Sequence, residues 1–167
     1  CDQFQPALES GSALVPVARS VNKIDQLWVI DEIEAVVIAS PTGLHYEHAR
    51  AAIKAGKHVF VEKPMTTNHR EAVALSRLAD EITVVLMVGH TYLYNGAVID
   101  IKRRIDEGEI GDIRYAYGQR LNLGRFRHDC DVIWTLAPHD ITIFNYWFNG
   151  RPRTVSARTL SYLSNDR

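Results

Sequence analysis

Three short apolar segments, separated by stretches of helical composition, constrain the fold of this chain most. They cover residues 35–40, 58–62 and 83–89, and the first is followed by the turn signal 41–43. Continuous apolar runs of this length are typical of strands that are buried on both faces of a parallel sheet. The sequence therefore predicts three parallel strands, each ending at a turn or a polar residue.

Helices are expected between these strands. Residues 44–55 have helical composition and stop at Gly56, a residue that commonly follows a helix in the left-handed conformation. A second helix, capped by Asn68, is expected to run to about residue 81. Strands that alternate with helices of this length indicate βαβ units. The predicted fold class is α/β, a doubly wound Rossmann sheet.

In such sheets, ligands bind beyond the carboxyl ends of the strands. Pro41, Lys63 and His90 each lie just past one of the predicted strand ends. We therefore expect a ligand site at this edge, with these residues close together.

The pattern changes after the third strand. We place a domain boundary near residue 92, between a Rossmann part, residues 1–91, and part of a second, α+β domain, residues 92–167. The second part is expected to hold a helix closing at Gly108, a helix ending at 149–150, a polar loop, and two strands. The loop covers 122–131 and the strands cover 113–121 and 155–163. The aromatic side chains of the later helix are expected in the core: Phe144, Tyr146, Trp147 and Phe148.

No Gly-x-Gly-x-x-Gly turn occurs in the chain, although dinucleotide-binding sheets usually carry one after their first strand. We interpret the chain as an incomplete stretch that lacks this first βα unit. Under that interpretation Cys1 and Asp2 end the second strand of the fold, where an acidic residue can bind the adenosine ribose.

The overall composition argues against several classes of function. With 19 basic and 20 acidic residues the net charge is −1, so no surplus of positive charge favours nucleic acid. No apolar run approaches the roughly 20 residues needed to cross a bilayer. Two cysteines without paired spacing suit a reducing compartment, and a cytoplasmic protein is expected.

Lys63 and His139 are the candidates for proton chemistry. Lys63 follows a predicted buried strand, where desolvation and neighbours can lower an ammonium pKa; the alternative is a surface lysine beside a turn. We expect Thr135 to cap a helix and Pro138 to lie in its first turn, so that His139 stands near the positive helix end. That position favours a neutral imidazole, which can act as a base; the alternative is a helix–loop contact.

Metal sites are not predicted. His45 and His48 are three residues apart, but no third ligand accompanies them. The segment 128–131 holds histidine, aspartate and cysteine without the spacing of a metal site, so a solvated loop is expected there.

An ordered set of short motifs resembles the Gfo/Idh/MocA oxidoreductase family over roughly residues 25–160. The motifs are Ala39-Ser40-Pro41-Thr42 with His45, Ala55-Gly56-Lys57-His58-Val59, Glu62-Lys63-Pro64, Met87-Val88-Gly89-His90, Gly108 with Ile110-Gly111, and Leu136-Ala137-Pro138-His139-Asp140-Ile141. The resemblance implies that residues 1–91 are part of a dinucleotide-binding Rossmann domain. It implies that residues 92–167 are part of a substrate and oligomerisation domain with a large open, mostly antiparallel sheet. It also implies NAD or NADP as cofactor, with oxidation or reduction at a sugar or polyol carbon.

The same resemblance implies roles for individual residues. Lys63 and His139 match the catalytic lysine and histidine of the family. Residues expected at the cofactor, besides Asp2, are Ser40, Pro41, Thr42, His45, Glu62, Lys63 and Pro64. Residues expected at the substrate are Lys63, His90, Tyr92, Thr135, His139 and Asp140. Many members place aspartate where this chain has Thr135, which removes a carboxylate partner from His139.

The segment 134–141 is most similar to the branch that contains UDP-N-acetylglucosamine 3-dehydrogenases. The resemblance also implies a homo-oligomer formed through the open sheet. A different class of function stays open, a non-catalytic protein of the same fold that senses NAD(P) or a sugar. A metal-dependent isomerase would need a carboxylate and histidine cluster that the sequence does not offer.

Overall fold

The centre of the computed structural model, which describes residues 1–121 and 130–160, is a parallel sheet of three strands in the order β1-β2-β3. The strands are β1 (Ala35–Ile38), β2 (His58–Val61) and β3 (Leu86–Val88). Val61 lies opposite Ile38 on one side and Val88 on the other. The three predicted strands are confirmed, although each is shorter than its apolar run.

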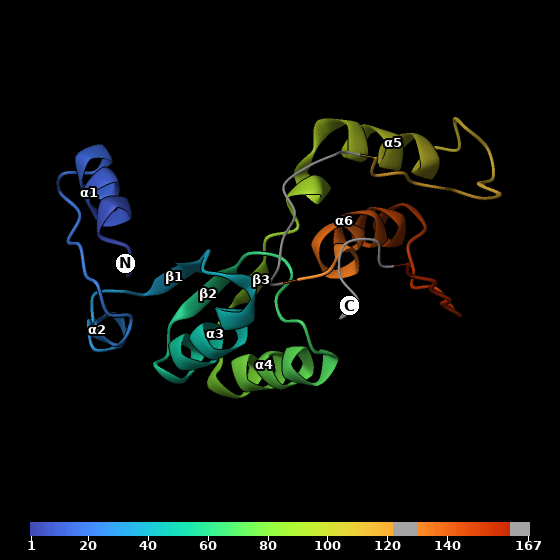
Figure 1. The fold of residues 1–167 in the computed structure, drawn as a ribbon. Coiled ribbons are helices and arrows are strands. Elements are labelled where there is room, and N and C mark those ends of the chain that lie inside the picture. The colour runs from blue at the N-terminus through green and yellow to red at the C-terminus, as the bar shows by residue number, and fades with distance from the viewer. Residues whose placement is uncertain (122–129, 161–167) are drawn as a thin grey trace.

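Two helices cover one face of this sheet (Figure 1). A 3-10 turn, η1 (Thr42–Leu44), leads into α3 (His45–Lys54), and α4 (His69–Ile82) follows β2. Gly56 has a φ of 72°, the left-handed conformation expected of it. The Asn68 side chain accepts a hydrogen bond of 2.8 Å from the backbone N–H of Arg70, which confirms the predicted cap.

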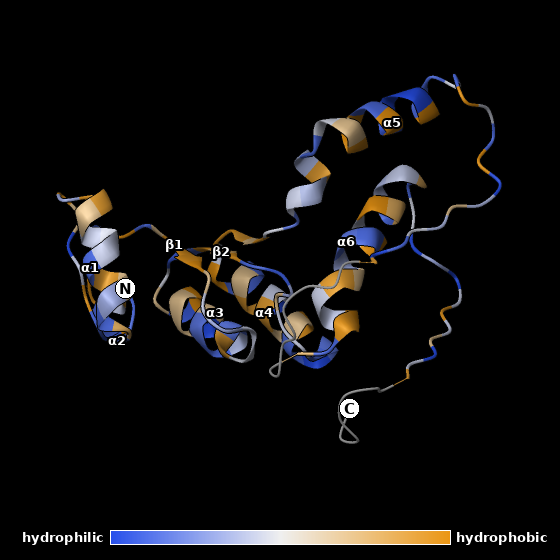
Figure 2. Cartoon of the chain, turned by 45° about the horizontal axis from the view of Figure 1, so that its top comes forward, coloured by the Kyte–Doolittle hydropathy of each residue, from blue (hydrophilic) through white to orange (hydrophobic). Residues whose placement is uncertain are grey.

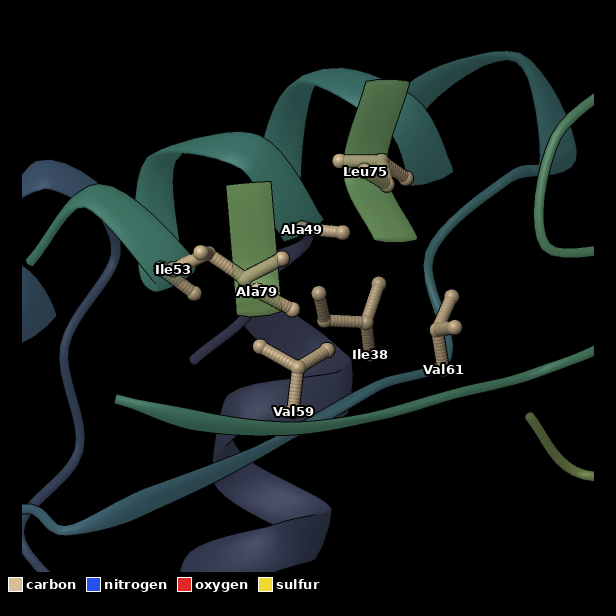
Figure 3. Close-up of a cluster of buried hydrophobic side chains, with 8 residues drawn as sticks. Ile38, Ala49, Ile53, Val59, Val61, Leu75 and Ala79 are labelled. Atoms are coloured by element: carbon tan, nitrogen blue, oxygen red, sulfur yellow. The ribbon is translucent and has the colours of Figure 1, made fainter. Parts of the chain in front are cut away.

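The hydrophobic core lies between the sheet and these two helices, as Figure 3 shows. It consists of Ile38, Ala49, Ala52, Ile53, Val59, Val61, Leu75 and Ala79. Figure 2 shows the hydrophobic colour of β1 and β2. The expected burial on both faces is wrong, however, because Val37 is 75% exposed and Val85 60% exposed on the face away from the helices. Nothing in the described chain covers that face.

The segment before β1 differs from expectation. It holds two helices, α1 (Gln5–Leu14) and α2 (Asp25–Trp28), and α1 has no buried residue. Neither helix was among those predicted from the sequence. Asp2 belongs to no strand; it is exposed, and its carboxylate accepts the N–H of Phe4 at 2.8 Å. The expected strand end at Asp2 is wrong for this structure.

Beyond β3 the chain forms a 3-10 turn, η2 (Thr91–Tyr94), and two helices, α5 (Gly96–Asp106) and α6 (Val132–Trp147). The closing of α5 before Gly108, whose φ is 73°, is confirmed. The indole N–H of Trp147 donates to the carbonyl of Val98 at 3.0 Å and so joins α6 to α5. Tyr146 and Phe148 are exposed and Phe144 and Trp147 are only half-buried, so the expected core position of this aromatic set is wrong.

The two strands predicted in this part are not formed over their described residues, 113–121 and 155–160. Strand backbone needs a neighbouring strand to satisfy its N–H and C=O groups, and no described segment pairs with either one. Residues 161–163 lie outside the described part, as do 122–129 of the predicted loop. Cys130 is buried rather than solvated. The domain boundary near residue 92 stays a prediction.

Candidate active site

The carboxyl ends of the three strands bring Pro41, Lys63 and His90 to one edge of the sheet. The backbone hydrogen bonds between neighbouring strands continue past the strand ends. Glu62 N donates to Ile38 O at 2.9 Å, and Gly89 N donates to Val61 O at 2.8 Å. The residues after each strand are therefore aligned, as the sequence predicts.

Lys63 reaches from this edge to the second part of the chain. Its half-buried ammonium donates a hydrogen bond of 2.9 Å to the backbone carbonyl of Thr135, in α6. The alternative of a solvated surface lysine is therefore wrong. The bond also places the positive charge one helical turn before His139.

Helix α6 begins earlier than expected. Its N-cap is Asp131, whose carboxylate accepts the N–H of Trp134 at 2.9 Å, so the predicted cap at Thr135 is wrong. Pro138 consequently lies inside the helix, where it supplies no N–H and its ring crowds the carbonyl four residues earlier. Thr142 donates its hydroxyl to Pro138 O at 2.8 Å. Aspartate is at least as good a cap as threonine, which suits the earlier start of the helix.

His139 is buried, with 8% of its surface exposed, and the ring of Tyr92 meets it edge-on with ring centres 4.7 Å apart. Burial lowers the pKa of His139, and the positive charges of Lys63 and Arg120 lower it further. The neutral imidazole is thus favoured, as expected. The reason differs from the expected one. The helix dipole acts within the first helical turn, and His139 lies beyond that turn.

Two imidazoles at the site have unused hydrogen-bonding capacity. The Nδ1 atoms of His90 and His139 are buried and have no partner among the described residues. Burial also lowers the pKa of His90. Buried polar atoms are nearly always paired in folded proteins, so an unpaired atom of this kind suits a site that receives a polar ligand.

Arg120 is a site residue that the sequence analysis missed. Its guanidinium donates two hydrogen bonds to the Asp140 carboxylate, at 2.8 and 2.9 Å. The guanidinium carbon also lies 4.9 Å from the ring centre of Tyr92. The Arg120–Asp140 ion pair, Tyr92 and His139 therefore form one continuous cluster of side chains in contact. The only signal was a single arginine in an otherwise uncharged run, 115–121.

The residues expected at the cofactor fall into two groups. Ser40, Thr42, His45, Glu62, Lys63 and Pro64 are buried or half-buried at the sheet edge, whereas Pro41 is exposed there. A Cβ on Gly89 would lie 3.2 Å from Phe60 and 3.3 Å from the Glu62 carboxylate, so a larger residue there would displace these two side chains. These features fit the nicotinamide half of a dinucleotide. Asp2 is exposed and its carboxylate accepts the N–H of Phe4, and the described residues offer no matching site for the adenosine half.

The structure offers no metal site in the part of the chain that it describes, since no three candidate ligands cluster there. His45 contacts two backbone carbonyls, and His48 Nδ1 lies 3.0 Å from the Ser40 hydroxyl. His128 and Asp129 of the other candidate lie outside the described residues. None of the described helices is long and apolar enough to cross a membrane.

Residues 5–90 match the family model described as an oxidoreductase family with an NAD-binding Rossmann fold. Among curated proteins, the NADP-dependent scyllo-inositol 2-dehydrogenase IolW of Bacillus subtilis is 33% identical over 162 residues, 90% of this chain and 44% of that protein. UDP-N-acetylglucosamine 3-dehydrogenase of Acidithiobacillus ferrooxidans is 34% identical over 140 residues, 83% of this chain and 43% of that protein.

Solved structures of similar proteins superpose on this chain. The protein yvaA of Bacillus subtilis superposes with a TM-score of 0.85 at 32% identity, covering 98% of this chain and 48% of that one. KijD10, a 3-ketoreductase of Actinomadura kijaniata solved with TDP-benzene and NADP, has a TM-score of 0.62 at 30% identity, covering 68% and 35%. The chain thus spans less than half the length of these relatives.

Proposed function

The chain belongs to the Gfo/Idh/MocA oxidoreductase family, and from this premise we propose that it carries the catalytic edge of an NAD(P)-dependent dehydrogenase acting on CH–OH groups. The observation that supports the proposal most is the bond from the Lys63 ammonium to the helical turn before His139. It brings a cation and a buried imidazole to one place at the carboxyl ends of the strands, where ligands of this fold bind.

The residues present suit proton handling at a hydroxyl. When bound, a nicotinamide dinucleotide would supply the hydride acceptor. His139 would take the hydroxyl proton, since its lowered pKa keeps the ring neutral at working pH. Lys63 would donate a hydrogen bond to the same oxygen and stabilise the negative charge that develops there. In the reverse direction the protonated His139 returns the proton.

Substitution of the family's aspartate by Thr135 leaves His139 without a carboxylate four residues before it. In this chain the threonine contributes its backbone carbonyl, which accepts the Lys63 hydrogen bond. Asp140 raises the pKa of His139, but burial and the cations outweigh it. We infer that His139 functions with the Arg120–Asp140 pair beside it rather than with a carboxylate on its own helical face.

The substrate class proposed is a sugar, nucleotide sugar or polyol. The relatives that support it are named for scyllo-inositol, for UDP-N-acetylglucosamine and for a 3-keto reduction. The choice within this class, the choice between NAD and NADP, a cytoplasmic location and a homo-oligomer stay predictions.

Absorbance of the reduced nicotinamide tests the proposal directly. The protein is incubated with NAD or NADP and a panel of inositols, hexoses and UDP-sugars, and turnover is followed at the nicotinamide band. We expect at least one substrate to be oxidised, and Lys63→Ala to lower turnover by about 10²-fold or more, much more than it weakens cofactor binding. Lys54→Ala, an exposed lysine on α3, is the matched control and should leave turnover unchanged.

Two results would contradict the proposal. Near-normal turnover of Lys63→Ala would remove the role assigned to the ammonium. Binding of cofactor and sugar without any turnover would instead favour the sensor of the same fold, which needs neither Lys63 nor His139.

A further inference from the structure

His45 holds an unusual pair of hydrogen bonds. The ring is buried on α3, with Nδ1 2.8 Å from the carbonyl oxygen of Pro64 and Nε2 2.8 Å from the carbonyl oxygen of Ser40. Carbonyl oxygens only accept hydrogen bonds, and a neutral imidazole carries a single N–H. A neutral ring would therefore direct a lone pair at one of the two oxygens. Both bonds form together only when both ring nitrogens carry hydrogen.

The second histidine of the same helix provides a contrast. His48 Nδ1 lies 3.0 Å from the hydroxyl oxygen of Ser40, which can either donate or accept, so a neutral ring satisfies this bond. Burial lowers the pKa of His48, against the opposing charge of Glu47, and so favours a neutral His48 ring. The two rings are thus expected in different protonation states, although they lie on one helix three residues apart.

The two carbonyls that His45 contacts belong to loops that follow neighbouring strands. Ser40 comes after β1, and Pro64 comes directly after Lys63, beyond β2. The far end of the Lys63 side chain is held by the Thr135 carbonyl. His45 therefore links the backbone at the base of Lys63 to the neighbouring strand end, while α6 holds its ammonium.

We propose that His45 is a positioning residue for Lys63: as an imidazolium it donates one hydrogen bond to Ser40 O and one to Pro64 O, and so fixes the backbone from which Lys63 projects. The proposal rests on the proposed function only in assigning Lys63 a catalytic role. The ring itself does not touch the reacting atoms. It acts by limiting the positions that the Lys63 ammonium can occupy.

Protonation of the ring can be measured without any activity. In the wild-type chain labelled with 15N-histidine, the imidazole nitrogen shifts of each ring are assigned through bonds to the backbone, in the assay buffer. We expect His45 to carry hydrogen on both nitrogens and His48 to carry it on one. A His45 ring with one unprotonated nitrogen would overturn the proposal, whatever the enzyme does.

Kinetics separate positioning from a purely structural role. His45→Gln keeps a donor but cannot bridge both carbonyls, so kcat should fall by about tenfold or more, while the KM of the substrate changes less than about threefold. His69→Gln changes an exposed histidine on α4 and should leave both constants unaltered. Circular dichroism checks that each variant is folded. A folded His45→Gln variant with kcat within about twofold of wild type would contradict the proposal.

The two parts of the test fail independently. If no substrate is turned over by the wild type, the proposed function fails while the 15N measurement still decides the protonation of His45. If the wild type is active but His45 is neutral, the dehydrogenase proposal stands and the positioning role is removed.

Discussion

Removing one charge of the ion pair beside His139 is the most informative perturbation of the site. The Arg120–Asp140 pair is joined by two hydrogen bonds, and its side chains are 24% and 30% exposed. Arg120 lowers the pKa of His139, whereas Asp140 raises it. Arg120→Met removes a cation and should therefore raise the pKa of His139. Asp140→Asn removes an anion and should lower it.

The expected size follows from the geometry. Arg120 and His139 both contact the ring of Tyr92, at 4.9 and 4.7 Å from its centre, so the guanidinium carbon lies within about 10 Å of the imidazole. At about 10 Å a unit charge contributes about 0.4 kcal/mol with the dielectric of water and about 1.7 kcal/mol with an effective dielectric of roughly 20, and a shorter separation gives more. Shifts of this size or larger should be measurable on a pH profile.

The assay is the pH dependence of kcat/KM in the direction of alcohol oxidation, whose acid limb reports the free-enzyme base. Arg120→Met should move this limb to higher pH and Asp140→Asn should move it to lower pH. Both variants break the same ion pair, so urea unfolding should show each of them less stable, by about 1 kcal/mol. Arg114→Met removes an exposed arginine and is the control, with no expected change in the limb.

Opposite pH shifts with the same loss of stability would be hard to obtain from a change in packing alone. Movement of both acid limbs in one direction would refute the electrostatic argument. An unchanged limb in both variants, despite the loss of stability, would refute it as well.

Three further predictions concern stability, measured by urea unfolding. Asp131→Ala should cost about 1 kcal/mol, because it removes the N-cap of α6, and an unchanged unfolding midpoint would contradict that assignment. Leu75→Ala should cost about 2–5 kcal/mol in the closed core, whereas Val37→Ala on the exposed face should cost far less; equal losses would contradict the one-sided core. The lowered pKa values of His90 and His139 imply stability that is complete above about pH 6.5 and is lost as the pH falls through the folded-state values. Replacing both by glutamine should flatten this acid dependence, and an unaltered slope would contradict it.

The βαβ part of the fold could be predicted from sequence because local signals agree there. Apolar runs, the Asn68 cap and Gly56 each point to the same strand–helix alternation, and the structure confirms the elements. The residues past the strand ends followed from the same pattern, since parallel strands bring their carboxyl ends to one edge.

Other features depend on contacts that no local pattern encodes. The cap of the last helix was predicted at Thr135 because Pro138 then falls in a first turn, whereas Asp131 caps the helix four residues earlier. The Lys63 bond joins residues 72 positions apart, and Arg120 becomes a site residue only through Asp140 and Tyr92. The expected strands are not formed over their described residues, 113–121 and 155–160, because alternation predicts a strand only where a neighbouring strand exists.

The central claim is that Lys63 and His139 act together on one hydroxyl. A double-mutant cycle tests it most directly, with kcat measured for wild type, Lys63→Met, His139→Gln and the double variant. We predict that each single change lowers kcat by about 10²-fold or more and that the double variant is no more than a few-fold slower than the slower single one. Two effects that simply multiply would show that the two groups act independently, and would contradict the account.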